Sequence, residues 1–149
     1  INNFDAGWRL LNHGDKSLDI KYPRFRDKLD LFFIDHEWVP LLVQDGYLNS
    51  FGRDRNSLRD LEVMADASES ISFGDELNRK LRTTMNWSLL PDVGLASSVA
   101  PCLLIRGKSF YPGFPQWLGK NSSARKSLRQ IRELKAVMGT NAQASRKAI

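Results

Sequence analysis

Three adjacent residues, Asp35, His36 and Glu37, are the side chains in this sequence that most resemble hydrolytic machinery. A carboxylate beside an imidazole can activate water when both groups reach the same substrate. Neighbouring residues on a helix point in different directions, however, so three in a row do not converge on one substrate. A polar junction between two helices is the simpler interpretation, and an enzyme acting through these residues is the weakest function considered.

The residue types of metal and nucleotide sites are also poorly represented. Two histidines and one cysteine cannot form a zinc framework. The string closest to a phosphate-binding loop, FPQWLGKN at 114–121, has Phe114 in place of the first glycine and Asn121 in place of Ser or Thr. We therefore expect no catalytic residue, no metal, no cofactor-binding residue and no ATP site in this chain. The lone Cys102 is expected in the core as a small hydrophobe.

Charge is divided unequally between the two halves of the sequence. Residues 1–75 contain 9 Lys and Arg against 14 Asp and Glu, a balance of −5, whereas residues 76–149 contain 13 against 3, a balance of +10. This asymmetry suggests that the C-terminal half faces an anionic partner, of which nucleic acid is the common case. A solvated basic surface without a partner is the alternative.

Arg125, Arg129 and Arg132 have the most regular spacing among the basic residues, at i, i+4 and i+7. On a helix this spacing places all three on one face. The apolar residues expected on the opposite face are Leu128, Ile131, Leu134 and Met138. We take the three arginines as candidate DNA-binding residues, with simple solvation as the alternative.

The elements that would position these residues are all helical. Apolar residues recur at helical spacing, and no convincing run alternates apolar with polar residues. Pro40 suits the first turn of a helix, whereas Pro101 is expected to kink or divide one. The helices are expected over 3–12, 25–35, a segment starting near Pro40, 57–71, 76–84, 89–105, a brief turn at 116–119, and 123–138.

Several residues are expected to begin or end these helices. Ser57 and Asp75 could cap two of them, with a break over 72–75 between them, and Asn86 or Ser88 could cap the next. Gly119 is expected to end the brief turn, and Asn121 or Ser122 to cap the last helix. The buried seam of the helix that starts near Ser57 is expected at Leu58, Leu61, Ala65 and Ser68, with Met64 and Ile71 beside it.

Length and composition predict one globular domain over residues 1–149. The chain is 42% hydrophobic and 26% charged. No stretch approaches the roughly 18–20 consecutive apolar residues of a membrane span, so we expect no membrane association. Because the sequence starts at Ile1 without a leader, we expect a segment of a longer protein.

Four segments identify a family when taken together and in order. They are DLFFIDHEWVPLLVQDGYL (30–48), ADASESISFGDELNRKLR (65–82), NWSLLP (86–91) and FPQWLGKNS (114–122). They resemble the C-terminal region of the large subunit in the replication factor C family of eukaryotic sliding-clamp loaders. The similarity runs from Phe4 to about Met138, nearly the whole chain.

The resemblance carries expectations about fold and partners. It implies an all-α, helical collar-type domain that joins the other replication factor C subunits in a hetero-pentamer. The family would add further helices after Ile149, so the resemblance also implies a domain that is incomplete at its C-terminal end. The ATP and Mg²⁺ sites would lie upstream, in an AAA+ ATPase module outside this chain. The loader would act in the nucleus, in DNA replication and repair, on primer–template DNA and on the PCNA sliding clamp, the clamp being contacted by the rest of the subunit.

The resemblance also implies a role for two aromatic residues. In loaders of this kind, aromatics of the large-subunit collar lie against the primer 3′ end and help to unpair terminal bases. The matching positions are Trp87 and Phe33, whereas Trp8, Trp38 and Trp117 are expected in the core. Stacking on an aromatic face is worth about 1–3 kcal/mol per base. A buried core role for Trp87 is the alternative.

A second function remains open, that of a free-standing basic helical module that binds nucleic acid. It rests on the basic half of the chain and on the three arginines. A free module should bind DNA tightly by itself, whereas a collar domain should bind it poorly without its partner subunits.

Overall fold

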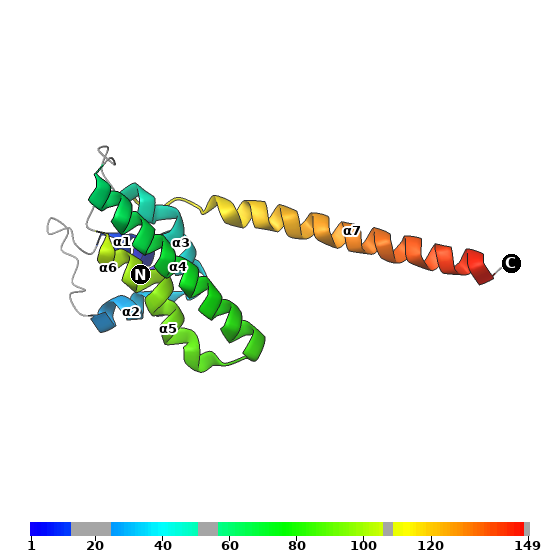
Figure 1. Ribbon diagram of the computed structural model, residues 1–149, viewed down its shortest axis with the longest axis horizontal. Helices are drawn as coiled ribbons and strands as arrows, with labels where there is room; N and C mark the ends of the chain where they lie inside the picture. The colour runs from blue at the N-terminus through cyan, green and yellow to red at the C-terminus, as the bar shows by residue number, and fades with distance from the viewer. Residues whose placement is uncertain (13–24, 51–56, 106–108, 148–149) are drawn as a thin grey trace. The chain divides into compact units, whose positions relative to one another are not determined.

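The structure is a computed structural model of the chain that describes residues 1–12, 25–50, 57–105 and 109–147, with side chains described up to Met138. All regular elements in these residues are helical, which confirms the predicted all-α fold. The chain divides into two compact units, Ile1–Phe114 and Pro115–Ile149 (Figure 1). The expectation of one domain over 1–149 stays a prediction.

The first unit contains nine of the elements, several of them directly continuous with the next. Short helices α1 to α3 precede one long helix, α4, which is followed by a continuous helical run. The elements are α1 (Asn3–Leu11), α2 (Phe25–Ile34), α3 (Trp38–Gly46), η1 (Tyr47–Ser50), α4 (Leu58–Thr84), η2 (Trp87–Leu89), α5 (Leu90–Gly94), η3 (Leu95–Val99) and α6 (Ala100–Leu104). The second unit is the single helix α7 (Gln116–Lys147).

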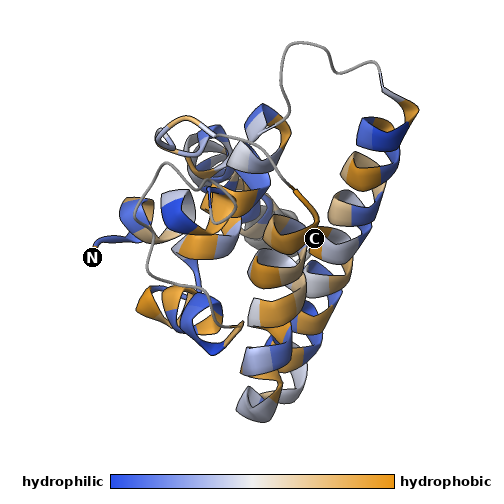
Figure 2. Cartoon of the chain, turned by 90° about the vertical axis from the view of Figure 1, so that its left-hand side faces the viewer, coloured by the Kyte–Doolittle hydropathy of each residue, from blue (hydrophilic) through white to orange (hydrophobic). Residues whose placement is uncertain are grey.

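The run from η2 to α6 is the central element of the first unit. Its parts contact α4, α2 and α3, and Figure 2 shows hydrophobic residues alternating with polar ones along the packed helices of the first unit. Within the described residues, Trp87–Leu104 is long and apolar enough to cross a membrane, but 44% of it is buried inside the protein. Burial between helices accounts for this composition, as in other core helices.

Two buried clusters hold these helices together. The first joins α1, α2, α3 and α6 through Ala6, Leu10, Leu11, Leu31, Val39, Val43 and Cys102, with Tyr47 packed against it. The second joins α2, α4 and α5 through Phe32, Leu81 and Val93, with Leu29, Leu77, Leu89 and Leu90 packed against it. Cys102 is fully buried, as expected, and burial raises the pKa of its thiol well above the ordinary range.

The predicted break over residues 72–75 is wrong, because α4 continues through it without interruption. Gly74 is a close-approach residue here and not a helix end. A Cβ placed on Gly74 would lie 2.7 Å from the backbone nitrogen of Ser97, so its absence lets α4 and η3 pack closely. Asp75 therefore lies in a helix interior and caps nothing.

The buried face of α4 also differs from the expected seam. The buried residues are Ala67, Ile71, Gly74 and Leu81, whereas Leu58 and Leu61 are exposed. Both sets have helical spacing, so periodicity alone cannot choose between them. The observed face contains Gly74, and its missing side chain lets η3 approach α4 closely. Ser57 does precede α4, but its side chain makes no capping hydrogen bond.

Pro101 is accommodated by a change of helical pitch. The five residues immediately before α6 form a π-helical turn, η3, which widens the helix ahead of the proline ring. Proline has no N–H to donate, and the carbonyl of Ala96, five residues earlier, accepts instead from Ser70 Oγ of α4 at 2.8 Å. The helical run therefore passes through Pro101 and ends at Leu104.

The prediction that Gly119 ends a short turn is also wrong. Helix α7 runs from Gln116 to Lys147 through this glycine, and a Cβ at Gly119 would contact nothing within 4 Å. An exposed glycine costs a helix only about 1 kcal/mol, which the good helix formers around it offset. Trp117, expected in the core, is exposed.

Candidate nucleic-acid interface

Trp87 is the first residue of η2 and directly follows a tightly defined corner at the end of α4. Met85 ends α4 in the left-handed region, with φ 55° and ψ 25°, and turns the chain away from the helix axis. Asn86 then caps η2, its Oδ1 accepting from the Ser88 nitrogen at 3.3 Å and from Ser88 Oγ at 2.6 Å. Of the two candidate capping residues, Asn86 and Ser88, it is therefore Asn86 that caps this helix. These contacts fix the backbone on both sides of Trp87.

The indole of Trp87 is half exposed and has one aromatic neighbour. Its exposed fraction is 49%, which is incompatible with a fully buried core residue. The imidazole of His36 lies 6.4 Å away between ring centroids, at an interplanar angle of 88°. An edge-to-face contact of this kind orients an indole and leaves part of its surface open to a ligand.

Phe33 is exposed at the C-terminal end of α2, beside a fully buried neighbour. Its exposed fraction is 46%, whereas Phe32 is 0% exposed and belongs to the second core cluster. The two rings meet edge to face with centroids 5.2 Å apart. Because Phe32 is held in the core, Phe33 is held on the outside of the same helix turn.

The three residues considered as hydrolytic machinery have separate structural roles. Asp35 Oδ1 accepts from the backbone nitrogens of Glu37 and Trp38 at 3.0 Å each, so this carboxylate caps the start of α3. Glu37 forms an ion pair of 2.9 Å with Arg82 of α4. His36 faces Trp87. The three side chains thus diverge, as the helical-junction interpretation predicted.

The candidate arginines lie on α7, in the second unit. Arg125, Arg129 and Arg132 are all exposed. Arg129 Nε lies 3.6 Å from Glu133 Oε1, an exposed ion pair that contributes little to stability. The apolar residues expected on the other face are exposed as well, namely Leu128, Ile131, Leu134 and Met138, and so is Val137. Helix α7 therefore presents both a basic and an apolar surface.

The remaining tryptophans are partly buried or exposed. Trp8 and Trp38 are half-buried and make aromatic contacts, Trp8 with Tyr111 and Trp38 with Phe4 and Phe114. Trp8 and Trp38, which were expected in the core, are therefore only partly buried. Among the residues that the structure describes, no group of three His, Cys, Asp or Glu side chains is placed to hold a metal ion.

Sequence reasoning missed two contacts at this site. The His36–Trp87 pair and the Arg82–Glu37 ion pair both join the α2–α3 junction to the C-terminal end of α4 or the turn after it. These residues are about fifty positions apart in the sequence, and no local pattern signals that they meet.

The chain is similar to large subunits of a replication factor over nearly its whole length. A family model described as "Replication factor RFC1 C terminal domain" matches residues 71–149. Proteins named replication factor C subunit 1 are 37% identical in Homo sapiens over 98% of this chain, and 34% identical in Arabidopsis thaliana and in Saccharomyces cerevisiae, each over 90% of it. The chain spans 13%, 14% and 16% of the length of these three relatives.

Proposed function

This chain belongs to the family of replication factor C large subunits, through their C-terminal domain, and from that premise we propose that it is the collar domain of a sliding-clamp loader. Its first role is assembly with the other replication factor C subunits into a hetero-pentamer. Its second role is to contact the primer 3′ end and unpair its terminal bases. It performs no catalysis itself.

The rest of the proposal concerns parts of the loader outside this chain. ATP and Mg²⁺ bind an AAA+ ATPase module elsewhere in the subunit, and that module acts on the PCNA clamp. The complex works in the nucleus on primer–template DNA, in replication and repair. The match to large subunits along 90–98% of this chain supports these roles.

The observation that carries the DNA role is the fixed, half-exposed indole of Trp87. Its backbone is held by the Asn86 cap and its ring contacts His36, so the ring loses little freedom when a base stacks on it. Stacking supplies about 1–3 kcal/mol per base, the same order as unpairing a terminal base requires. Phe33 offers a second exposed ring on α2.

The test is a loader reconstituted with the full-length large subunit and a primer that carries a fluorescent base analogue at its 3′ terminus. Trp87→Ala should lower the unpaired fraction by a factor of about five or more, since 1.4 kcal/mol corresponds to tenfold. Phe33→Ala should do so in part. Assembly and ATP hydrolysis should stay near wild type because half of the Trp87 ring is already in water.

Matched controls are available in the same chain. Trp117→Ala and Phe73→Ala remove aromatic side chains that are each 55% exposed but lie on α7 and on the middle of α4. Both should leave the base-analogue signal unchanged. If Trp87→Ala instead lowered the melting temperature sharply and left primer unpairing intact, the indole would be a structural residue and the DNA role would be wrong.

The runner-up function is a free-standing basic helical module that binds nucleic acid. The observation that favours it is the exposed face of Arg125, Arg129 and Arg132 on a helix that forms its own unit. Co-purification separates the two functions. A collar domain should co-purify with small ATPase subunits and bind DNA poorly alone, whereas a free module should bind DNA tightly without partners.

A further inference from the structure

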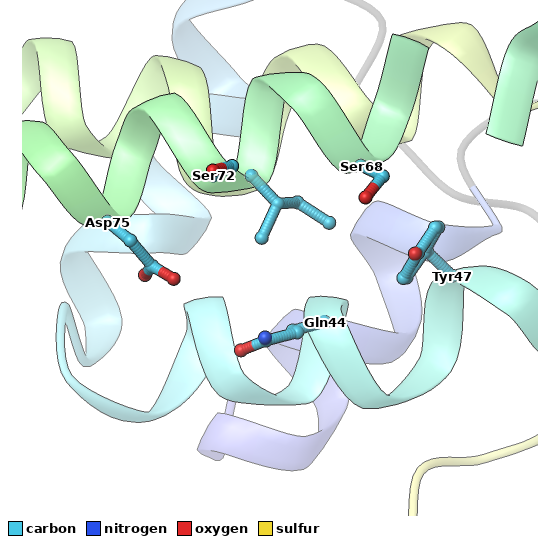
Figure 3. A pocket seen from close by; sticks show the side chains of 6 residues that line it. Gln44, Tyr47, Ser68, Ser72 and Asp75 are labelled. Atoms are coloured by element: carbon cyan, nitrogen blue, oxygen red, sulfur yellow. The ribbon is translucent and has the colours of Figure 1, made fainter. Parts of the chain in front are cut away.

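A polar cleft opens between α3 and α4 of the first unit. It has a volume of about 250 Å³, with Gln44 and Tyr47 on one side and α4 on the other (Figure 3). Figure 3 shows the carboxylate of Asp75 and the amide of Gln44 projecting into the space between the two helices. The lining residues are Gln44, Tyr47, Ser68, Ile71, Ser72 and Asp75.

The polar side chains of this cleft have no partners in the described part of the chain. The side chains of Asp75, Gln44, Tyr47, Ser68 and Ser72 make no hydrogen bond or ion pair with another residue that the structure describes, and all of them except Tyr47 are exposed to solvent. Burial raises the pKa of the Asp75 carboxyl above its ordinary value, and no cation offsets that effect. The oxygen atoms of these side chains are therefore open to a ligand, and a cation that replaced the water around Asp75 would form a charge-assisted hydrogen bond with its carboxylate.

We propose that this cleft receives the guanidinium group of an arginine side chain from a partner protein. The carboxylate of Asp75 supplies the opposite charge, and the Gln44 amide oxygen and the serine hydroxyls supply further acceptors. Arginine carries five donors in a planar fork and no acceptor, which suits a site with several oxygen acceptors. The Tyr47 ring also lines the cleft, and a guanidinium group can pack against an aromatic ring.

Other ligand classes fit less well. A phosphate backbone would be repelled by Asp75, so this cleft is unsuited to nucleic acid. A divalent metal prefers several carboxylates, and the cleft offers one. The first unit, residues 1–114, contains 16 Asp and Glu against 14 Lys and Arg, a net charge of −2, which does not oppose a cationic partner. The volume of the cleft is several times the roughly 30 Å³ that a water molecule occupies, which is enough for the end of a long side chain.

The test is a titration of this chain with Nα-acetyl-arginine amide, followed by NMR at the side-chain amide of Gln44. We expect saturable binding in the millimolar range that Asp75→Asn weakens by about tenfold or more, since a hydrogen-bonded charge is lost. Nα-acetyl-citrulline amide is the uncharged analogue of the probe and should not bind. Asp66→Asn removes an exposed acid of α4 outside the cleft and should leave binding unchanged.

A gain-of-function variant keeps the proposal testable if Asp75→Asn folds poorly. Gln44→Glu adds a second carboxylate to the cleft and should tighten binding of the arginine probe several-fold. Three results would overturn the proposal: no saturable shift at Gln44, a shift of equal size in Asp75→Asn, or free arginine binding at least tenfold more tightly than the blocked probe. The last result would identify a small-molecule site and not a docking site for a protein side chain.

Discussion

The close contact between α4 and η3 makes a sharp prediction for Gly74→Ala. An added Cβ would lie 2.7 Å from both the nitrogen and the Cβ of Ser97 and 2.8 Å from its Cα. Two of these three atoms are backbone, so no side-chain rotation can remove the clash. The helices would have to separate by about 0.7 Å to restore an ordinary contact of roughly 3.4 Å, and close-packed interiors resist such shifts.

The expected loss of stability follows from two opposing terms. Overpacking a core typically costs about 1–3 kcal/mol. Replacing glycine by alanine in a helix returns about 1 kcal/mol. Because backbone atoms are involved, we place the cost in the upper part of its range and expect a net loss of about 1–2 kcal/mol for Gly74→Ala.

Urea unfolding of the chain, followed by far-UV circular dichroism, measures this loss directly. Gly119→Ala is the matched control, because its Cβ would contact nothing within 4 Å and the residue lies inside exposed α7. Alanine there should raise helix content and never destabilise. If Gly74→Ala were as stable as the wild-type chain, the close approach of α4 and η3 would not be a packing constraint and the reasoning would fail.

Three further predictions concern the surface. His36→Ala removes an edge-to-face contact worth about 0.5–1.5 kcal/mol and should alter the fluorescence emission of Trp87; an equal change in a Trp87→Phe background would show that His36 acts elsewhere. Neutralising Arg125, Arg129 and Arg132 should reduce the salt dependence of DNA binding by the loader, by roughly one unit of slope per lost phosphate contact; an unchanged slope would leave them as solubilising residues. Because the folded-state pKa of Asp75 is raised, the folded chain holds this proton more tightly than the unfolded chain, and stability contributed by the protonated form is lost as pH rises through the folded pKa. Urea titrations should therefore give Asp75→Asn the same free energy of unfolding as the wild type at strongly acid pH. At neutral pH the variant should be as stable as the wild type or more stable, by up to about 0.5 kcal/mol.

The helical class of this protein follows from its sequence because apolar spacing is a local property. The first helix, the second helix and the Asn86 cap are found where the pattern predicts them. Breaks are harder to predict, because a glycine has the same signature whether it ends a helix or admits a neighbour. Gly74 lets Ser97 approach α4, whereas Gly119 neither ends a helix nor contacts a neighbouring helix. Both predicted helix ends are therefore wrong for reasons that only the packing reveals.

In the candidate site too, local features could be predicted from the sequence and contacts between distant segments could not. The half-exposed state of Trp87 agrees with its position at the start of η2, and the exposure of Phe33 follows from the burial of Phe32 beside it. The contact with His36 and the cleft around Asp75 join segments that are distant in the sequence. Periodicity reports which face of a helix is apolar, but it carries no information about which polar residues meet across two helices.

Phe33 and Trp87 are anchored to one buried cluster, and this ties the fold to the proposed DNA contact. Phe32 precedes Phe33, and Leu89 follows Trp87 by two residues; both belong to or pack against the cluster around Val93. The Phe32 ring also lies so close to Gly94 that a Cβ there would meet its Cε1 at 2.7 Å. The two exposed rings thus share a rigid support, so a change in the packing of Phe32 would displace both of them together. A pair of aromatic surfaces held in this way can meet a splayed base without first being ordered, and this removes the side-chain ordering cost from such a contact.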